Sequence, residues 1–226
     1  MMTLTERERL KKLMALATGD EKHDESSNST FDVLWVLYDR VMRYAPRNPR
    51  SEGRDRFVLS KGHGPVSYFA ILADKGFFPA EELRKFETWE GILGGHPDRN
   101  LVPGVEASTG SLGHGLPMAI GVALGLRAKG SERRVFALIG DGECNEGSIW
   151  EAILLAGNLG LANLTCILID NHSSSQNLGD MVAKFTSFGW EACAINGRDH
   201  EQIYKALIHT HPERPIAIVA DIEKES

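Results

Sequence analysis

The stretch GDGECNEGSIWEAILLAGNLGLANLTCILIDN, from Gly140 to Asn171, decides the fold of this chain. It places Asp141 and Asn171 each just after an apolar, strand-like run, with an amphipathic segment between them that is long enough for one crossover helix. Because the carboxyl ends of parallel strands meet at one edge of a sheet, we expect the two side chains to lie close together. A carboxylate and an amide oxygen there can share a hard cation, which would in turn hold a diphosphate.

The turn around Asp141 has the composition of an anion site. Gly140 and Gly142 flank the carboxylate, and glycine lets backbone N–H groups approach an anion closely. The next helix is predicted to begin near Asn145, so that its positive end points into the same crevice. The backbone carbonyl of Ser173 is the candidate third protein ligand. GDG or DN alone is a common turn, and only their pairing across one strand–helix–strand unit indicates a site.

Strand-like and helix-like segments alternate outward from this unit. A first helix is predicted from Thr5, with Glu8 completing a capping box, and a second from about Thr30. The predicted strands are 56–60, 134–140, 164–171, 189–195 and 215–221. The alternation predicts an α/β fold with a doubly wound, mostly parallel sheet and helices on both faces. We expect one domain over residues 1–226, with residues 1–55 as a helical lead-in.

Composition excludes several classes of protein. The chain has 226 residues, 42% of them hydrophobic, and a net charge of −6, which argues against a nucleic-acid partner. No apolar run reaches membrane-spanning length, and the charged N-terminus lacks the apolar core of a signal peptide. The three cysteines, Cys144, Cys166 and Cys193, form no CxxC pair and no disulfide framework. We therefore expect a cytoplasmic protein.

Several motifs, taken in order, resemble the transketolase family of thiamine diphosphate enzymes. LSKGHGPVSYFAIL, starting at Leu59, is similar to the family element S-K/N-G-H-G. GGHPDRNLVPGVEASTGSLGHG, ending at Gly115, is similar to its G-H-P and G-V-E-x-x-T-G-x-L-G-x-G elements, and Gly140 to Asn171 to its cofactor motif. The resemblance spans nearly the whole chain and implies the N-terminal, diphosphate-binding part of a transketolase. It also implies thiamine diphosphate and Mg²⁺, or Ca²⁺ or Mn²⁺ in its place.

The resemblance implies roles for individual residues. The metal ligands are Asp141, Asn171 and the carbonyl of Ser173, and the cofactor contacts are His63, Gly110, Ser111, Leu112, Gly140, Asp141, Gly142 and Asn171. His63 matches a histidine that contacts the diphosphate and faces the substrate, and His96 one that binds the donor sugar. Glu146 matches an acid near the dimer interface that links the two active sites. His23 stands where the family has a substrate histidine, but without the flanking glycines.

Three departures from the family pattern lie on the substrate or cofactor-ring side. A further histidine, which follows the last strand in the family, is absent, and the loop around His23 is altered. The segment after Asn171 is short and carries Ser175 where an apolar cofactor contact is usual. The glutamate that activates the aminopyrimidine comes from a separate pyrimidine-binding domain in this family. The resemblance therefore implies an α₂β₂ heterotetramer with a C-terminal partner subunit.

Three functions are compatible with these residues. The first is one half of a two-component transketolase-like transferase, moving a two-carbon ketol unit from a ketose donor to an aldose or aldehyde acceptor. The second is a specialised carboligase or acyl transferase, for example in secondary metabolism, whose substrate is not a pentose phosphate. The third is a cofactor-binding paralogue without turnover. The intact set of Asp141, Asn171 and Glu146 argues against the third.

Overall fold

The computed structural model describes residues 2–18 and 24–223. Its centre is a five-stranded sheet in the order β1-β2-β3-β5-β4, in which every neighbouring pair is parallel. The strands are β1 (Arg56–Leu59), β2 (Val135–Gly140), β3 (Leu164–Asp170), β4 (Glu191–Asn196) and β5 (Ile216–Asp221). Parallel neighbours require crossover connections, which the helices supply. The predicted α/β class with a parallel sheet is confirmed.

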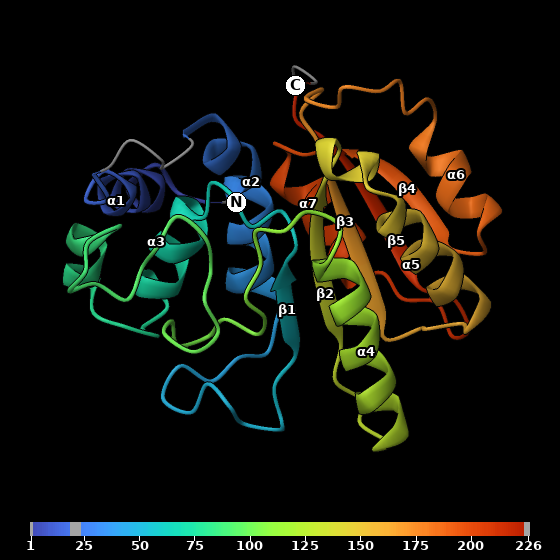
Figure 1. Cartoon of the computed structure of the whole chain (residues 1–226), viewed down its shortest axis with the longest axis horizontal. Coiled ribbons are helices and arrows are strands. Elements are labelled where there is room, and N and C mark those ends of the chain that lie inside the picture. The colour runs from blue at the N-terminus through green and yellow to red at the C-terminus, as the bar shows by residue number, and fades with distance from the viewer. Residues whose placement is uncertain (1, 19–23, 224–226) are drawn as a thin grey trace.

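Helices cover both faces of the sheet, and the strands alternate their side chains between two hydrophobic clusters. In β2, Phe136 and Leu138 enter one cluster, whereas Ala137 and Ile139 enter the other. The first cluster lies under α1 (Leu4–Met14), α2 (Asp24–Val36), α3 (Val66–Asp74) and α7 (His200–Ile208). The second lies under α4 (Gly115–Ala128), α5 (Gly147–Asn158) and α6 (Met181–Ser187). Figure 1 shows α4 and α5 in front of the sheet and α6 beside its β4 edge.

Three short helical turns complete the described elements, a π turn at Leu37–Val41 and 3₁₀ turns at Ala80–Lys85 and Gly142–Asn145. The last of these precedes α5, so the helix predicted near Asn145 begins at Gly147. None of the helices in residues 2–18 and 24–223 combines the length and the apolar character needed to cross a membrane.

Two helix starts differ from the sequence-based prediction. The capping box of α1 is formed by Thr3 and Glu6, because the Thr3 hydroxyl accepts from Glu6 N at 3.2 Å and Glu6 Oε2 accepts from Thr3 N at 2.8 Å. Helix α2 begins at Asp24 rather than near Thr30. Its serine-rich first turns are typical of a loop, yet Ser27 is fully buried and its hydroxyl accepts from Ser67 N of α3 at 2.7 Å. A tertiary contact therefore stabilises helix where local preference favours a loop.

Candidate functional site

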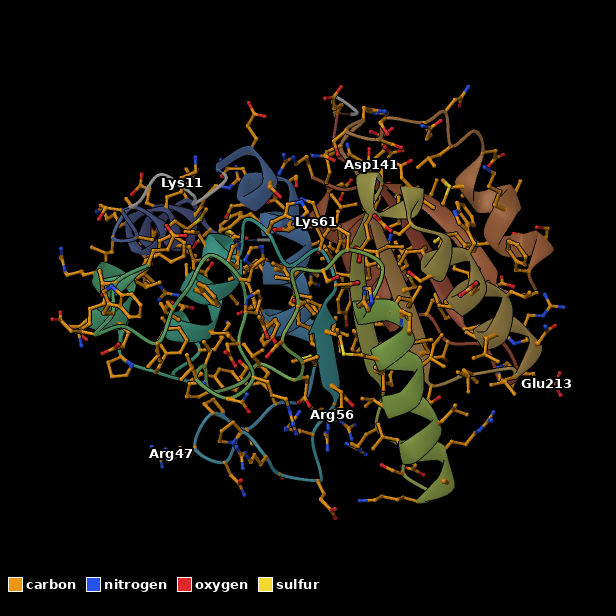
Figure 2. The ribbon with its side chains drawn as sticks, viewed as in Figure 1. Lys11, Arg47, Arg56, Lys61, Asp141 and Glu213 are labelled. Atoms are coloured by element: carbon orange, nitrogen blue, oxygen red, sulfur yellow. The ribbon has the colours of Figure 1, made fainter. Side chains whose placement is uncertain are left out.

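Asp141 lies directly after β2, at the carboxyl end of the sheet, and its side chain is 1% exposed. Figure 2 shows it at the top edge of the sheet. Its Oδ1 accepts from Gly142 N at 2.8 Å, and its Oδ2 accepts from Ser173 N at 2.5 Å and from Ser174 N at 2.9 Å. The loop after β3 therefore wraps the carboxylate with neutral donors.

Ser173 joins the two predicted metal ligands. Its hydroxyl oxygen lies 2.7 Å from Asp141 Oδ1 and 2.8 Å from Asn171 Oδ1. One hydroxyl carries a single hydrogen, so it can satisfy only one of these two acceptors at a time. Three oxygens of carboxylate, amide and hydroxyl type thus converge, and the one hydroxyl hydrogen lies among them. Such a donor set fits a hard divalent cation.

The carbonyl of Ser173, which the sequence indicated as a metal ligand, faces the same turn. A Cβ added to Gly142 would lie 3.5 Å from Ser173 Oγ and 3.8 Å from the Ser173 carbonyl oxygen. Both oxygen atoms of Ser173 are therefore within reach of the turn after Asp141. The structure brings Asp141, Gly142, Asn171 and Ser173 together at one place.

Lys61 is a residue of this site that the sequence analysis did not select. It follows β1 at the same edge of the sheet, is 4% exposed, and its Nζ donates to Ser26 Oγ at 2.6 Å and Ser29 Oγ at 3.1 Å. Burial lowers the pKa of Lys61 to about 8, and the charges of Asp141 and Glu143 oppose that shift. The signal that could have identified it is its place directly after a strand, in KGHG.

Gly140 makes room for this lysine. A Cβ at Gly140 would lie 2.9 Å from Cδ of Lys61. The turn before Asp141 must therefore lack a side chain if the lysine stem is to pass across it. The glycine predicted to approach an anion also lies against a cation.

Glu143 is a second buried charged residue that sequence reasoning missed. It is 2% exposed, and its Oε1 accepts from Ser60 Oγ at 2.5 Å and from Gly113 N at 2.9 Å. Its Oε2 accepts from Gly140 N at 3.3 Å. Burial raises the pKa of Glu143 while these hydrogen bonds lower it. The side chain ties the ends of β1 and β2 to the loop before α4.

The glycine-rich motifs converge beside this cluster. Gly110 has φ of +141°, and a Cβ there would lie 2.6 Å from Cδ2 of His96, so the imidazole packs directly on the glycine backbone. A Cβ at Gly62 would lie 2.7 Å from Gly110 N. Thr109 Oγ1 donates to Leu59 O at 2.7 Å and fastens the loop to the end of β1. KGHG, GGHP and TGSLG therefore meet at the carboxyl end of β1.

The remaining predicted residues lie around this cluster with different exposure. His63 is half-buried and its carbonyl accepts from Ser26 Oγ at 3.2 Å, whereas His96 is exposed. Ser111 is exposed and Leu112 is half-buried, both in the loop before α4. Glu146 is exposed and packs against Gly113, where an added Cβ would lie 2.8 Å from the Glu146 Cβ. His23 lies outside the described residues.

Asp32, in α2, is a buried ionic centre. It is fully buried, and Arg7 Nη2 (2.6 Å), Arg198 Nη1 (3.0 Å) and His200 Nε2 (2.8 Å) all donate to it. Burial opposes the charge, but the hydrogen bonds and charges of His200, Arg7 and Arg198 hold the pKa of Asp32 below its ordinary value. Arg198 Nη1 also donates to Asn28 O at 2.8 Å, which fastens the first half of α2.

An open cavity of about 310 Å³ adjoins Asp141 and is lined by the loop after β3. It reaches Ser174, Gln176 and Met181. Ser175 is exposed beside it, and its hydroxyl accepts from Asn145 Nδ2 at 3.2 Å. The loop thus presents polar side chains to the space next to the oxygen cluster.

Comparison with known proteins relates this geometry to one family. The family model described as "Transketolase, thiamine diphosphate binding domain" matches residues 4–221. The chain is 50% identical to ferredoxin fas2 of Rhodococcoides fascians over 216 residues, which are 95% of this chain and 71% of that protein. It is 35% identical to an apulose-4-phosphate transketolase subunit of Actinobacillus succinogenes over 212 residues, covering 89% of this chain and 76% of that protein.

A solved structure of similar fold is the transketolase from Campylobacter jejuni, with a TM-score of 0.84 and 28% sequence identity. The superposition covers 98% of this chain but 38% of that one. The chain therefore spans well under half the length of this solved transketolase, and about three quarters of the relative from Actinobacillus succinogenes.

Proposed function

The chain belongs to the transketolase family, as its thiamine diphosphate-binding domain, and from this premise we propose that it is one subunit of a two-component, magnesium-dependent transketolase-like enzyme. The enzyme moves a two-carbon ketol unit from a ketose donor to an aldose or aldehyde acceptor. The observation that carries the proposal is the convergence of Asp141, Asn171 and Ser173 oxygens around one hydroxyl hydrogen.

In this proposal Asp141, Asn171 and Ser173 hold the cation, and the glycine turn receives the diphosphate. When bound, thiamine diphosphate would supply a nucleophilic carbon for attack on a carbonyl and cleavage of the adjacent C–C bond. Gly142 N–H is already committed to Asp141 Oδ1, so the backbone orients the carboxylate toward the cation. Ca²⁺ or Mn²⁺ could occupy the same oxygen set.

Lys61 offsets the charge of the diphosphate. Its ammonium is held by the hydroxyls of Ser26 and Ser29 and is protonated for the most part at neutral pH, since its pKa is about 8. A buried cation beside the turn after β2 lowers the cost of bringing a polyanion there. His63 and His96 act on protons and hydroxyl groups of the substrate, with His96 held in place by its contact with Gly110.

The exposed faces of α4 and α5 support a partner chain that carries the pyrimidine-binding domain. Met118 of α4 and Leu154, Leu155 and Leu159 at α5 are exposed by 38% to 48%. Gly121 and Gly125 of α4 have open space where a side chain would stand, which allows another backbone to approach closely. Exposed apolar side chains in one patch mark interaction sites. Glu146, exposed at the start of α5, lies at the edge of this surface and suits the interface role.

The relative from Actinobacillus succinogenes carries the word subunit in its name, which supports a two-component enzyme. An α₂β₂ heterotetramer would pair each diphosphate site with a pyrimidine domain that provides the activating glutamate. The chain alone is then inactive. His23 belongs to the substrate side of this proposal, where its loop differs from the family pattern.

One observation favours the second function, a carboligase for a substrate other than a pentose phosphate. Ser175 is exposed and bonded to Asn145 where the family has an apolar cofactor contact. A polar loop next to the cofactor changes which substrate the site accepts.

The test combines this chain with its pyrimidine-domain subunit, thiamine diphosphate and Mg²⁺, and measures ketol transfer from xylulose 5-phosphate. Turnover that requires both subunits is expected. Turnover with a non-phosphorylated donor alone would replace the first function by the second. Metal-dependent cofactor binding without turnover on any ketose or 2-oxo acid donor would indicate a non-catalytic paralogue.

A further inference from the structure

A second cavity lies between two loops on the side of the molecule where β1 begins. It has a volume of about 270 Å³ and is formed by residues 49–54, which precede β1, and by residues 99–106. Three arginines line it, Arg50, Arg54 and Arg99. Figure 2 shows Arg47 and Arg56, which flank the first loop, at the end of the molecule opposite to Asp141. The cavity is therefore separate from the cofactor site.

Positive charge in this cavity exceeds negative charge. Glu106 is the one acidic residue among the lining residues, and it pairs with Arg54 and lies 3.9 Å from Arg56 Nε. Within the described part of the chain, the guanidinium groups of Arg50 and Arg99 have no ion pair. Burial lowers the pKa of Arg56 and the charge of Arg54 adds to this shift, whereas the charges of Glu106, Asp55 and Glu52 oppose it. Two guanidinium groups from different loops are left to bind an anion.

Both loops are held in place by their own hydrogen bonds. Thr109 N donates to Pro97 O at 3.2 Å and closes the base of the second loop, and Arg99 N donates to Ser108 Oγ at 2.9 Å. Asp55 closes the first loop by accepting from Arg43 N at 2.9 Å and Arg134 N at 3.0 Å. The arginines thus stand on preorganised backbone, which reduces the entropy lost when a ligand binds.

We propose that this cavity binds the phosphate group of a small phosphate ester or of inorganic phosphate. The planar carboxylate of Glu106 pairs with Arg54 through one oxygen, and its other oxygen lies 3.9 Å from Arg56 Nε. A tetrahedral dianion presents oxygens in several directions and accepts from forks on two loops, here Arg50 and Arg99. The volume of about 270 Å³ leaves room for a phosphate with a short carbon chain.

The test is calorimetric titration of the full chain with inorganic phosphate at constant ionic strength. The Lys61→Gln variant serves as background, so that phosphate in the cofactor site does not contribute. In this background we expect saturable binding of phosphate. The affinity should be about tenfold lower when Arg50→Gln or Arg99→Gln is added and about a hundredfold lower when both are added. Both side chains are exposed, and circular dichroism with a thermal midpoint verifies that each variant folds.

Arg47→Gln is the matched control, because Arg47 is exposed in the same loop and does not line the cavity. It should change the affinity for phosphate by less than twofold. If Arg47→Gln lowers the affinity for phosphate as much as Arg99→Gln does, phosphate responds only to the general surface charge. If no saturable binding is seen, the cavity is not a phosphate site. Either result overturns the proposal. Competition with glycerol 3-phosphate separates an ester from the free ion. Acetate binding as tight as phosphate would show that the cavity takes carboxylates, and the phosphate assignment would then be wrong.

Discussion

Asp32 and Asp141 are both buried carboxylates, yet the groups around them differ in kind. Asp32 accepts hydrogen bonds from Arg7, Arg198 and His200. The donors recorded to Asp141 in the described residues are backbone amides and one serine hydroxyl, all of them neutral. His200 Nδ1 accepts from Met2 N at 3.2 Å, so its Nε2 carries the hydrogen that goes to Asp32.

The difference teaches how to separate a structural carboxylate from a ligand. Burying a charge is costly unless it is paired, and Asp32 has its partners inside the protein. Asp141 is oriented by dipoles and keeps its negative charge available to a cation from outside. Burial alone therefore does not identify a functional acid, whereas the nature of its donors does.

The largest expected effect is on stability, from Asp32→Ala. The substitution leaves the guanidinium groups of Arg7 and Arg198 without their carboxylate and removes the contacts that join α1 and α2 to the loop before α7. We therefore expect the free energy of unfolding to fall by about 3 kcal/mol. Urea denaturation measures it. The control is Asp39→Ala, which removes the surface pair with Lys75 and should cost below about 1 kcal/mol. Equal losses in the two variants would refute the structural role of Asp32.

The pH dependence of stability should reflect the same carboxylate. The pKa of Asp32 is lowered from 3.8, so the folded state binds fewer protons than the unfolded state around and below that value. This contribution is present above about pH 4 and is lost as the pH falls further. In the Asp32→Ala variant the free energy of unfolding should depend less on pH below about pH 4 than in the wild type. An unchanged pH dependence would contradict the lowered pKa of Asp32.

Asp141→Ala should affect cofactor binding most. It removes the charged oxygen ligand, so we expect Mg²⁺-dependent affinity for thiamine diphosphate to fall by at least about a hundredfold, or about 2.7 kcal/mol. Calorimetry on the two-subunit complex measures it, with circular dichroism as the control for folding. Tight binding retained in this variant would show that the metal is held elsewhere.

Lys61→Gln tests the buried cation beside this turn. Loss of a charge-assisted contact should weaken diphosphate binding by about tenfold. The wild-type affinity should also decrease as the pH rises above about 8, because the free chain then carries a neutral Lys61 and binding must take up a proton. Lys61→Gln should lose that slope. If the slope remains, another group titrates.

The smallest effect is expected from Ser173→Ala. If the backbone carbonyl of Ser173 is the metal ligand, loss of the hydroxyl should alter Mn²⁺ affinity, measured by electron paramagnetic resonance, by less than about threefold. A loss of tenfold or more would assign the ligand role to the hydroxyl, which lies between Asp141 and Asn171. Ser175→Ala, two positions further along the same loop, is the control.

Sequence periodicity was sufficient for the sheet, since buried parallel strands are continuous apolar runs bounded by turns. All five predicted strands are present, and β2 and β3 are neighbours as the Gly140 to Asn171 unit requires. The predicted start of α2 was wrong because the serines of its first turns are typical of a loop. Thr30 Oγ1 donates to Ser27 O at 3.0 Å, and α3 covers the same turn, which no local pattern reveals.

The candidate site likewise contains residues that the sequence identified and residues that it did not. Asp141, Asn171 and the glycines were identifiable because strand ends and turn chemistry are local properties. Lys61 and Glu143 were not, because their partners lie 35 and 83 residues away, at Ser26 and Ser60.

The sequence by itself determined the parallel sheet and the edge at which the oxygens of Asp141 and Asn171 meet, because both follow from spacing along the chain. The tertiary structure alone decided which buried charges are neutralised inside the protein and which are left for a ligand. Asp32 is surrounded by two guanidinium groups and an imidazole, Asp141 accepts hydrogen bonds from neutral donors, and Arg50 and Arg99 have no ion pair within the described residues. Electrostatic compensation depends on distances between residues far apart in sequence, and only folding sets those distances.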